Sequence, residues 1–443
     1  MSQGDPEPQK PFHLEDFRLA AQKEQIKGEG WASPEALEAV VGADFPGDQE
    51  SAEGSGSFPA RARADWHRFS AGLLTRLNPW ELTIVIASAV GIAIAAYLFT
   101  SANDAGTVGL FALVALAPLS LVLVVMLRAG RFAPLPGRYW WFAAAWGAGV
   151  APLLAGVLNT VLLDDFTATT GDIDQAEFLT GVLVAPATEE LLKGGGVILV
   201  LLIARRRVVS RINGLVIGGV AGASFAFVEN IQYFIAAQGE GSSVLGMTIF
   251  ARSVMSPFIH PMATSMIGYF FASAMLKQGR AGSWAWRTAL GFCLAMGLHS
   301  LWNLLASTAY LWLLLYLVIE VPLFAGWLIW VSALGRSELK KVGQGLTSYV
   351  AAGWLTEPEL LAVSTLAGRR YSLRWARKVG GPARKSMRAY MRSAGRLGAD
   401  QLNMERWGPD LDRVELAKSA LRSMTQSREV FTRAGEFYYG SRK

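Results

Sequence analysis

Long apolar stretches, separated by short polar segments, dominate the middle of this chain. A helix needs about 20 mainly apolar residues to cross the hydrocarbon core of a bilayer. Eight stretches meet that requirement: 80–100, 108–127, 139–163, 177–203, 212–237, 247–276, 288–308 and 311–334. The last two are nearly continuous, and one helix through both would be about twice as long as the core is thick. We therefore expect a break at Ser307-Thr308 and an all-α polytopic membrane protein with about eight transmembrane helices.

The composition supports a membrane protein and excludes two other classes. Apolar residues make up 52% of the chain and charged residues 17%, whereas soluble domains carry roughly 25% charged residues. The single cysteine, Cys293, cannot form a disulfide within the chain, which excludes a disulfide-stabilised secreted scaffold. The first apolar stretch follows a long polar segment, so a secretory signal peptide is not expected either.

Charge divides the chain into three regions. Residues 1–79 carry a net charge of −5 and are expected to form an acidic, partly disordered cytoplasmic N-terminal region. Residues 80–334 have no net charge and form the predicted eight-helix membrane domain, while residues 335–443 carry +11 and are expected to be helical and cytoplasmic. Each Lys or Arg near an anionic leaflet contributes about 1 kcal/mol, so the basic section from Arg369 to Arg396 is a candidate for contact with anionic lipid headgroups. No nucleic-acid-binding motif accompanies these cations, and we expect no nucleic-acid partner.

The loops between the predicted spans alternate in charge, which indicates the orientation of the protein. Every second loop carries cations: Arg128, Arg131 and Arg138; then Arg205, Arg206, Arg207 and Arg211; then Lys277, Arg280 and Arg287. The intervening loops contain acidic residues but no Lys or Arg. Cation-rich loops face the cytoplasm, so we expect a multi-pass protein of the cell membrane with both termini cytoplasmic.

A few ionisable residues lie well inside the predicted spans, where they are costly. They are Glu189, Glu190, Lys193, Glu229, His260, His299 and Glu320. Each charged side chain at the centre of a membrane helix costs about 2.5–3.5 kcal/mol on insertion scales. An ion pair between Glu189 and Lys193, four residues apart on one helix face, recovers part of this cost. A second adjacent carboxylate has no structural need, so these residues are predicted to form a functional site.

The depth and the chemistry of these residues suggest hydrolysis. Glu189 and Glu190, His260 and His299 each lie at the middle of their spans, and Glu229 lies nearby, so four consecutive helices bring them to one level. Two neutral imidazoles and a carboxylate form a common catalytic zinc set, and a further carboxylate can accept a proton from water. Asn303, one turn after His299, can donate to a developing oxyanion. A metal-free variant, in which a glutamate activates water directly, fits the same residues.

Four motifs in this order resemble the PrsW family of intramembrane proteases, which is related to the CAAX-protease and bacteriocin-processing superfamily. They are Glu-Glu-Leu-Leu-Lys at 189–193, Phe-Ala-Phe-Val-Glu-Asn at 225–230, the single His260, and His-Ser-Leu-Trp-Asn at 299–303. The resemblance covers roughly residues 177–305, and a glutamate at 229 favours PrsW over the CAAX branch.

The resemblance implies a role for each matching residue. Glu189 and Glu190 are expected to be the catalytic glutamates, with Glu189 as the general base and Glu190 supporting it or binding metal. Glu229, His260 and His299 are expected to hold Zn²⁺ or, without a metal, to orient the water. Asn303 is expected to stabilise the oxyanion. The supporting residues are Lys193, which would neutralise the glutamate pair, with Phe225 and Asn230. The implied substrates are membrane-anchored proteins such as anti-sigma-factor-like regulators.

Two alternatives remain from the residues themselves. Carboxylates and imidazoles at the midplane also suit a proton- or ion-coupled transporter, although the sequence has no clear internal repeat of the kind that such proteins show. A catalytically silent scaffold is the weaker alternative, because it would have no reason to keep costly buried acids. Glu320 lies outside every motif and receives no role.

Overall fold

The computed structural model describes residues 77–133, 135–276, 283–308, 311–408 and 411–440, and these are almost entirely helical. The predicted acidic N-terminal region therefore lies outside the described residues up to position 76. The described residues fall into two compact units. The membrane unit comprises residues up to Arg131 and Leu135–Ser332, and the C-terminal unit comprises Ala333 onward together with residues 132–133.

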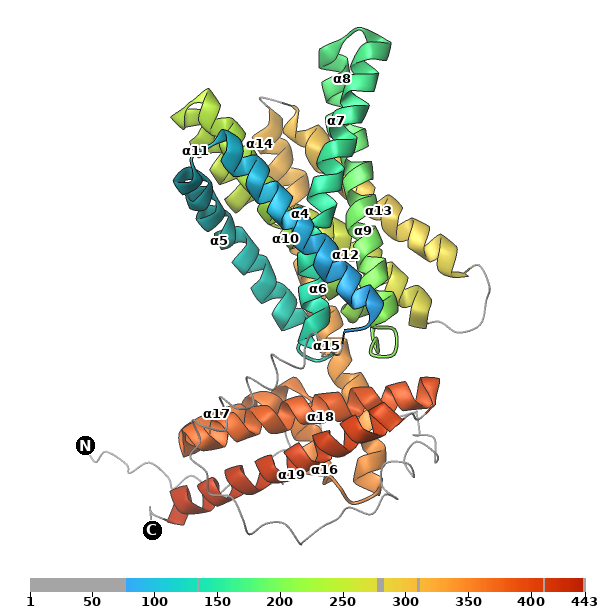
Figure 1. Ribbon diagram of the computed structural model, residues 1–443. Coiled ribbons are helices and arrows are strands. Elements are labelled where there is room, and N and C mark those ends of the chain that lie inside the picture. The colour runs from blue at the N-terminus through green and yellow to red at the C-terminus, as the bar shows by residue number, and fades with distance from the viewer. Residues whose placement is uncertain (1–76, 134, 277–282, 309–310, 409–410, 441–443) are drawn as a thin grey trace, which may run out of the picture. The chain divides into compact units, whose positions relative to one another are not determined.

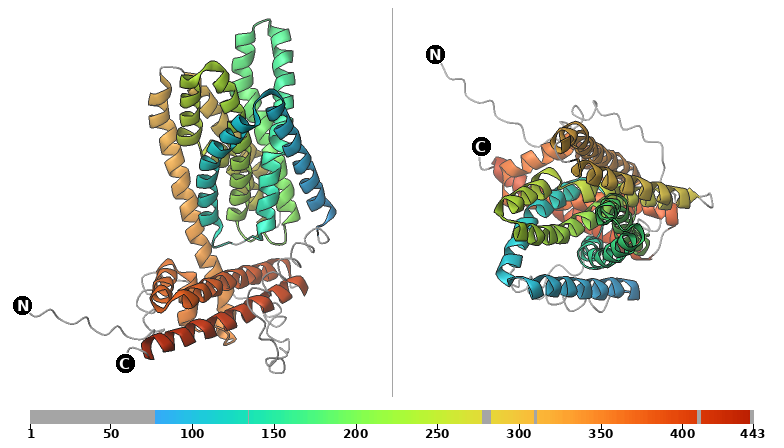
Figure 2. Two further views of the ribbon diagram at one scale, coloured as in Figure 1. Left: turned by 60° about the vertical axis from the view of Figure 1, so that its left-hand side comes forward. Right: turned by 90° about the horizontal axis from the view of Figure 1, so that it is seen from above.

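The membrane unit is a bundle of long helices that run up and down beside one another (Figures 1 and 2). Three short π-helical turns, labelled η, interrupt them. In order the elements are α4 (Pro79–Ala102), α5 (Ala105–Gly130), α6 (Gly137–Ala148), α7 (Val150–Thr170), α8 (Ile173–Leu179), η1 (Thr180–Val184), α9 (Ala185–Ile203), α10 (Arg211–Glu240), α11 (Ser242–Phe250), η2 (Ala251–Met255), α12 (Ile259–Leu276), α13 (Ser283–Ala306), α14 (Trp312–Leu315), η4 (Tyr316–Glu320) and α15 (Val321–Ala351).

The predicted all-α polytopic fold is confirmed. Seven helical segments are long and apolar enough to cross a membrane, judged by length and composition. The segment from α8 to α9 is not among the seven; it carries Glu189, Glu190 and Lys193 in its second half. The expected break is also present, because α13 ends at Ala306 and Ser307-Thr308 form a turn. The last span differs from its predicted end at residue 334, since the same helix continues without interruption to Ala351.

Helix α10 is the central helix of the membrane unit. Its most apolar 18-residue window is 83% buried, whereas the corresponding windows of the other six candidate spans are at most 28% buried. Ser210 begins the helix with a capping box, in which its side chain and that of Asn213 each accept from the other's backbone N–H. The middle of α10 can be buried on all sides because glycine recurs there every fourth residue.

Three of these glycines set the distance between α10 and α12. A Cβ atom at Gly214, Gly218 or Gly222 would collide with the backbone of α12 at Gly268, Thr264 and His260, respectively. Small residues at such spacing let two membrane helices approach backbone to backbone. The glycine stripe, Gly214, Gly218 and Gly222, thus allows α12 to contact α10 backbone to backbone at the turns that carry Thr264 and His260.

Replacing Gly218 by Ala should therefore destabilise the membrane unit. The new methyl group would meet the carbonyl oxygen of Thr264, and overpacking of this kind typically costs about 1–3 kcal/mol. Thermal unfolding of the purified protein in detergent should show the loss. Gly156→Ala on α7 is the matched control, because a Cβ at Gly156 meets nothing within 4 Å; equal stability of the two variants would contradict the role of the stripe.

The C-terminal unit has its own hydrophobic core. After the end of α15 it contains α16 (Glu357–Ser364), α17 (Leu366–Val379), α18 (Gly381–Trp407) and α19 (Leu411–Gly440). The buried core includes Tyr349, Trp375, Tyr390, Leu397 and Leu421. Thr356 and Glu359 form a capping box at the start of α16, and the Glu359 carboxylate also accepts from Arg428 Nε of α19 at 2.6 Å.

Candidate active site

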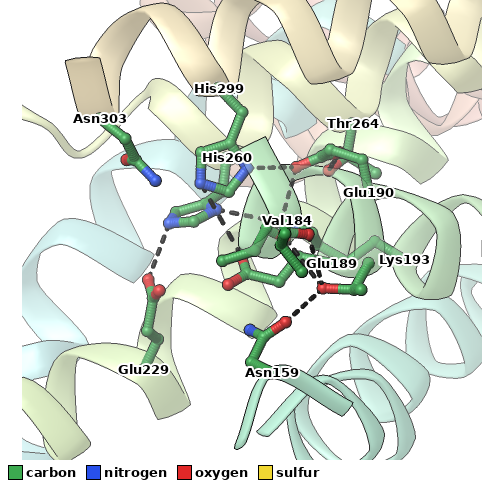
Figure 3. Close-up of polar contacts among 12 residues, drawn as sticks. Asn159, Val184, Glu189, Glu190, Lys193, Glu229, His260, Thr264, His299 and Asn303 are labelled. Carbon is green, nitrogen blue, oxygen red and sulfur yellow. Dashed lines mark hydrogen bonds and ion pairs between the residues drawn. The ribbon is translucent and has the colours of Figure 1, made fainter. Parts of the chain in front are cut away.

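The predicted site residues of four helices lie together inside the membrane unit (Figure 3). Helix α9 contributes Glu189, Glu190 and Lys193, and α10, α12 and α13 contribute Glu229, His260 and His299, respectively. The rings of His260 and His299 meet edge to face with centroids 4.7 Å apart. Five of the six residues are less than 10% exposed, and the Glu229 side chain is 13% exposed. Charged groups at such burial require partners.

Lys193 is the cation of this cluster. Its ammonium lies 2.6 Å from Glu190 Oε1 and 3.4 Å from Glu189 Oε2, one helical turn away on α9. The same nitrogen stands 4.1 Å from the centre of the Phe225 ring, a cation–π distance. Lys193 itself is fully buried, so the three contacts together replace the hydration of its charge.

Glu190 fixes the orientation of His299. Its Oε1 accepts from His299 Nδ1 at 3.1 Å, while its Oε2 accepts from the Thr264 hydroxyl at 2.8 Å. Both oxygens of Glu190 are therefore used by neighbouring side chains. With the proton on Nδ1, His299 keeps its lone pair on Nε2, which lies 3.8 Å from Glu189 Oε2.

Glu229 fixes the orientation of His260, as Glu190 does for His299. The Lys193 ammonium, which can only donate, lies 3.1 Å from His260 Nδ1, so Nδ1 must be the acceptor. His260 Nε2–H then donates to Glu229 Oε2 at 2.8 Å. The Phe225 ring packs against His260 with centroids 5.5 Å apart, which holds the imidazole from the side.

Arg252 of η2 holds Glu229 in turn, a contact that the sequence did not suggest. Its Nη2 is paired with Glu229 Oε2, and its Nε donates to the Asn230 side-chain oxygen at 2.9 Å. The guanidinium carbon lies 4.2 Å from the centre of the Tyr233 ring. Asn230, predicted as a supporting residue from its place beside Glu229, thus supports the site through Arg252.

Among the described residues, Glu189, His260 and His299 form the group that could hold a metal ion. One donor atom from each lies within 4.8 Å of the others. Two neutral imidazoles and one carboxylate are a common catalytic zinc set. Each imidazole here donates its N–H to a second carboxylate, His260 to Glu229 and His299 to Glu190, as metal-binding histidines usually do. The residues present therefore fit a divalent metal, with Glu189 in the place that the sequence assigned to Glu229.

Asn303 makes its hydrogen bond to the backbone of η1. Its side-chain N–H donates at 2.7 Å to the carbonyl oxygen of Gly181 in η1. That carbonyl needs an outside donor, because Pro186, five residues further along the π-helical turn, has no N–H. Asn303 thus braces the turn that precedes Glu189, and its predicted role at an oxyanion stays a prediction.

Sequence reasoning missed Thr264, Arg252 and the Asn159–Thr188 hydrogen bond between α7 and α9. A signal was available for Thr264, which lies four residues after His260 on the same face of α12. Arg252 gave no such signal, since one arginine near the end of an apolar stretch resembles an interfacial anchor. Glu320 is buried, and neither carboxylate oxygen has a hydrogen-bond partner among the described residues.

The comparisons with known proteins agree with the resemblance found in the sequence. Residues 135–327 match the model of the PrsW family intramembrane metalloproteases. This range includes every residue of the cluster. No curated protein and no solved structure matches the chain.

Proposed function

We propose that the cluster cuts a peptide bond of a membrane-anchored protein within the bilayer, because residues 135–327 match the model of the PrsW family intramembrane metalloproteases. The observation that carries the proposal is the convergence of Glu189, His260 and His299, whose donor atoms lie within 4.8 Å of one another. Each histidine donates one N–H to its own carboxylate, and His299 Nε2, the nitrogen without the proton, lies 3.8 Å from Glu189 Oε2. A structural ion-pair network would not need two imidazoles oriented in this way.

The three carboxylates divide into two that hold the imidazoles and one that is left to react. Glu190 is fully engaged by Lys193, His299 and Thr264. Glu229 is engaged by Arg252 and His260. Glu189 has only longer contacts, 3.4 Å to Lys193 and 3.8 Å to His299. Its carboxylate is thus the one with an oxygen available to take a proton, which supports it as the general base.

We assign His260 Nδ1, His299 Nε2 and one Glu189 oxygen to holding the metal, for which zinc is the proposed identity. His260 Nδ1 would exchange its present hydrogen bond from Lys193 Nζ, 3.1 Å away, for the ion. A bound divalent metal would lower the pKa of water and polarise the substrate carbonyl. Glu189 accepts a proton from water as the water oxygen attacks the peptide carbonyl carbon. The C–N bond then breaks, and the proton passes from Glu189 to the departing amine. Glu229 and Glu190 keep the imidazole rings in place throughout.

The cation-rich ends of the helices support the proposed orientation. Within the membrane unit, the α5–α6 and α9–α10 connections lie at the same end as the first turn of α4 (Figure 1). These connections carry Arg205, Arg206 and Arg207, among other cations. We propose that this end faces the cytoplasm and that both chain termini are cytoplasmic.

We also propose that the C-terminal unit contacts anionic lipid. Residues 366–399 contain no Asp or Glu, and α17 and α18 each expose an arginine stripe at helical spacing. The stripes are Arg370, Arg374 and Arg377 on α17, and Arg388, Arg392 and Arg396 on α18. The apolar faces of both helices are already used by the core, so the contact would be electrostatic and should weaken as salt rises.

Proteolysis by the purified protein tests the proposed function. Reconstituted into liposomes with a single-span model substrate, the wild type should release two fragments whose junction lies in the membrane segment. Treatment with a chelator should abolish cleavage, and added zinc should restore it. The helical content should survive chelation, because the ion pairs of Lys193 with Glu189 and Glu190 compensate the acids without a metal. Full cleavage by a metal-depleted protein would favour glutamate-only chemistry, and ion uptake without cleavage would favour a transporter.

A further inference from the structure

We infer that Arg252 is a positioning residue of the site, which acts on the metal through Glu229 and His260. The inference rests on the proposed function, because His260 is taken as a ligand. Its basis is an unbroken chain of side-chain contacts. Arg252 pairs with Glu229 Oε2, the same oxygen accepts from His260 Nε2 at 2.8 Å, and His260 belongs with Glu189 and His299 to the group that could hold a metal ion.

The position of Arg252 is itself over-determined, as a positioning residue requires. Its Nε donates to Asn230 Oδ1 at 2.9 Å, and its guanidinium stacks 4.2 Å from the Tyr233 ring centre. The planar guanidinium can contact Glu229 and Asn230 through two different nitrogens at once, which an ammonium cannot do. Glu229 and Asn230, two adjacent residues of α10, thereby hold the Arg252 guanidinium in place.

The π-helical turn explains how Arg252 reaches this place. Residues Ala251–Met255 form a π-helical turn, in which each backbone hydrogen bond spans five residues in place of four. The turn ends at Ser256, which donates both its N–H and its hydroxyl to the Ala251 carbonyl. A π-turn inserted into a helix shifts the register of the residues on either side, and such turns recur at functional sites. Arg252 and His260 consequently approach the same glutamate, although eight residues separate them.

The buried negative charge of Glu229 also requires Arg252 as its partner. The Glu229 side chain is 13% exposed and has a neutral imidazole as its other partner, so without Arg252 its negative charge would have no cation beside it. An uncompensated buried charge is strongly unfavourable, and the carboxylate would rotate toward water. That rotation would remove the acceptor for His260 Nε2–H and leave the ring held only at Nδ1, by Lys193.

Metal affinity measured in a double-mutant cycle tests the inference. The full-length protein in detergent would be titrated with zinc against a chelating competitor for the wild type, Arg252→Gln, Glu229→Gln and the double variant. Loss of an outer partner of a metal-binding histidine usually costs about 10–100-fold in metal affinity, and we expect this loss for Arg252→Gln. In the Glu229→Gln background the same substitution should cost less than about threefold, because the path through Glu229 is already removed.

Arg252→Lys and Arg128→Gln complete the series. The lysine variant keeps the charge and should retain affinity between that of the wild type and that of Arg252→Gln. Arg128 is an exposed arginine at the end of α5, and its substitution should leave zinc affinity unchanged. An undiminished affinity of Arg252→Gln, or an equal loss with and without Glu229, would overturn the inference.

A readout that needs no metal separates this inference from the proposed function. With ¹⁵N-labelled histidine, the Nε2–H proton of His260 in the metal-free wild type should have the downfield chemical shift of a hydrogen bond to a carboxylate, and Arg252→Gln should lose that shift. If the wild type bound no zinc but this shift depended on Arg252, the positioning role would stand and the metalloprotease proposal would fail. An Nε2–H shift that is the same in both proteins would overturn the positioning role.

Discussion

Glu189→Gln should abolish proteolysis while leaving the membrane unit folded. The substitution keeps the shape of the side chain but removes its ability to accept a proton, and general base catalysis is commonly worth about 10²–10⁴-fold in rate. Its contacts at 3.4 Å and 3.8 Å contribute little to stability. Cleavage of a reconstituted single-span substrate and thermal unfolding in detergent should be measured on the same preparation.

Glu190→Gln provides the contrast that makes this result specific. It should reduce both activity and thermal stability, because the Glu190 carboxylate is contacted by Lys193, His299 and Thr264 at 2.6–3.1 Å. Glu177→Gln on α8, at an exposed position, is the control that should change neither. Turnover at the wild-type rate by Glu189→Gln, together with its complete loss in a stable Glu190→Gln, would transfer the base to Glu190.

Lys193→Met should cause the largest loss of stability among the site variants. Lys193 is fully buried and is the cation that Glu189 and Glu190 share. Removing one partner of a buried ion pair typically costs about 3–5 kcal/mol, because the remaining charge is left uncompensated. Thermal unfolding of the purified protein should show this loss, and the exposed Lys340→Met should not.

A second substitution distinguishes charge compensation from simple packing. If the stability loss comes from an uncompensated acid, Glu190→Gln introduced into Lys193→Met should recover part of it. If it comes from a cavity left by the lysine side chain, the double variant should be no more stable than Lys193→Met. The second outcome would contradict the role of Lys193 as the neutralising cation.

Much of the candidate site could be predicted from the sequence because its members violate a strong local rule. Acids and imidazoles in the middle of apolar stretches are costly, so Glu189, Glu190, Glu229, His260 and His299 stand out without any knowledge of the fold. The spans are visible for the same reason, since hydropathy is a property of each segment by itself. The end of the last helix could not be predicted in this way, because α15 continues to Ala351 through polar sequence, where hydropathy gives no signal for a helix end.

The partners of these residues could not be predicted from spacing. Whether Glu229 or Glu189 joins His260 and His299 in the group that could hold a metal depends on how α9 and α10 are rotated about their axes. Hydropathy does not determine that rotation when both helices are buried on several sides. Arg252 illustrates the same limit, since its approach to Glu229 depends on a π-turn that shifts the register of one helix. Asn303 was placed on the face of His299, yet Gly181 accepts its N–H because a proline removes the normal donor.

The sequence by itself determined that this chain is a multi-pass helical membrane protein, which costly ionisable residues lie inside its spans, and which family its motifs resemble. Those properties follow from the transfer energies of single side chains and from motif order, which need no tertiary contacts. Only the tertiary structure decided which carboxylate contacts which imidazole, that Glu189 keeps only the longer contacts, and that Arg252 pairs with Glu229. These outcomes depend on the close contact of α10 with α12 along Gly214, Gly218 and Gly222, because backbone contact between two helices fixes their rotation and hence the direction of every side chain between them.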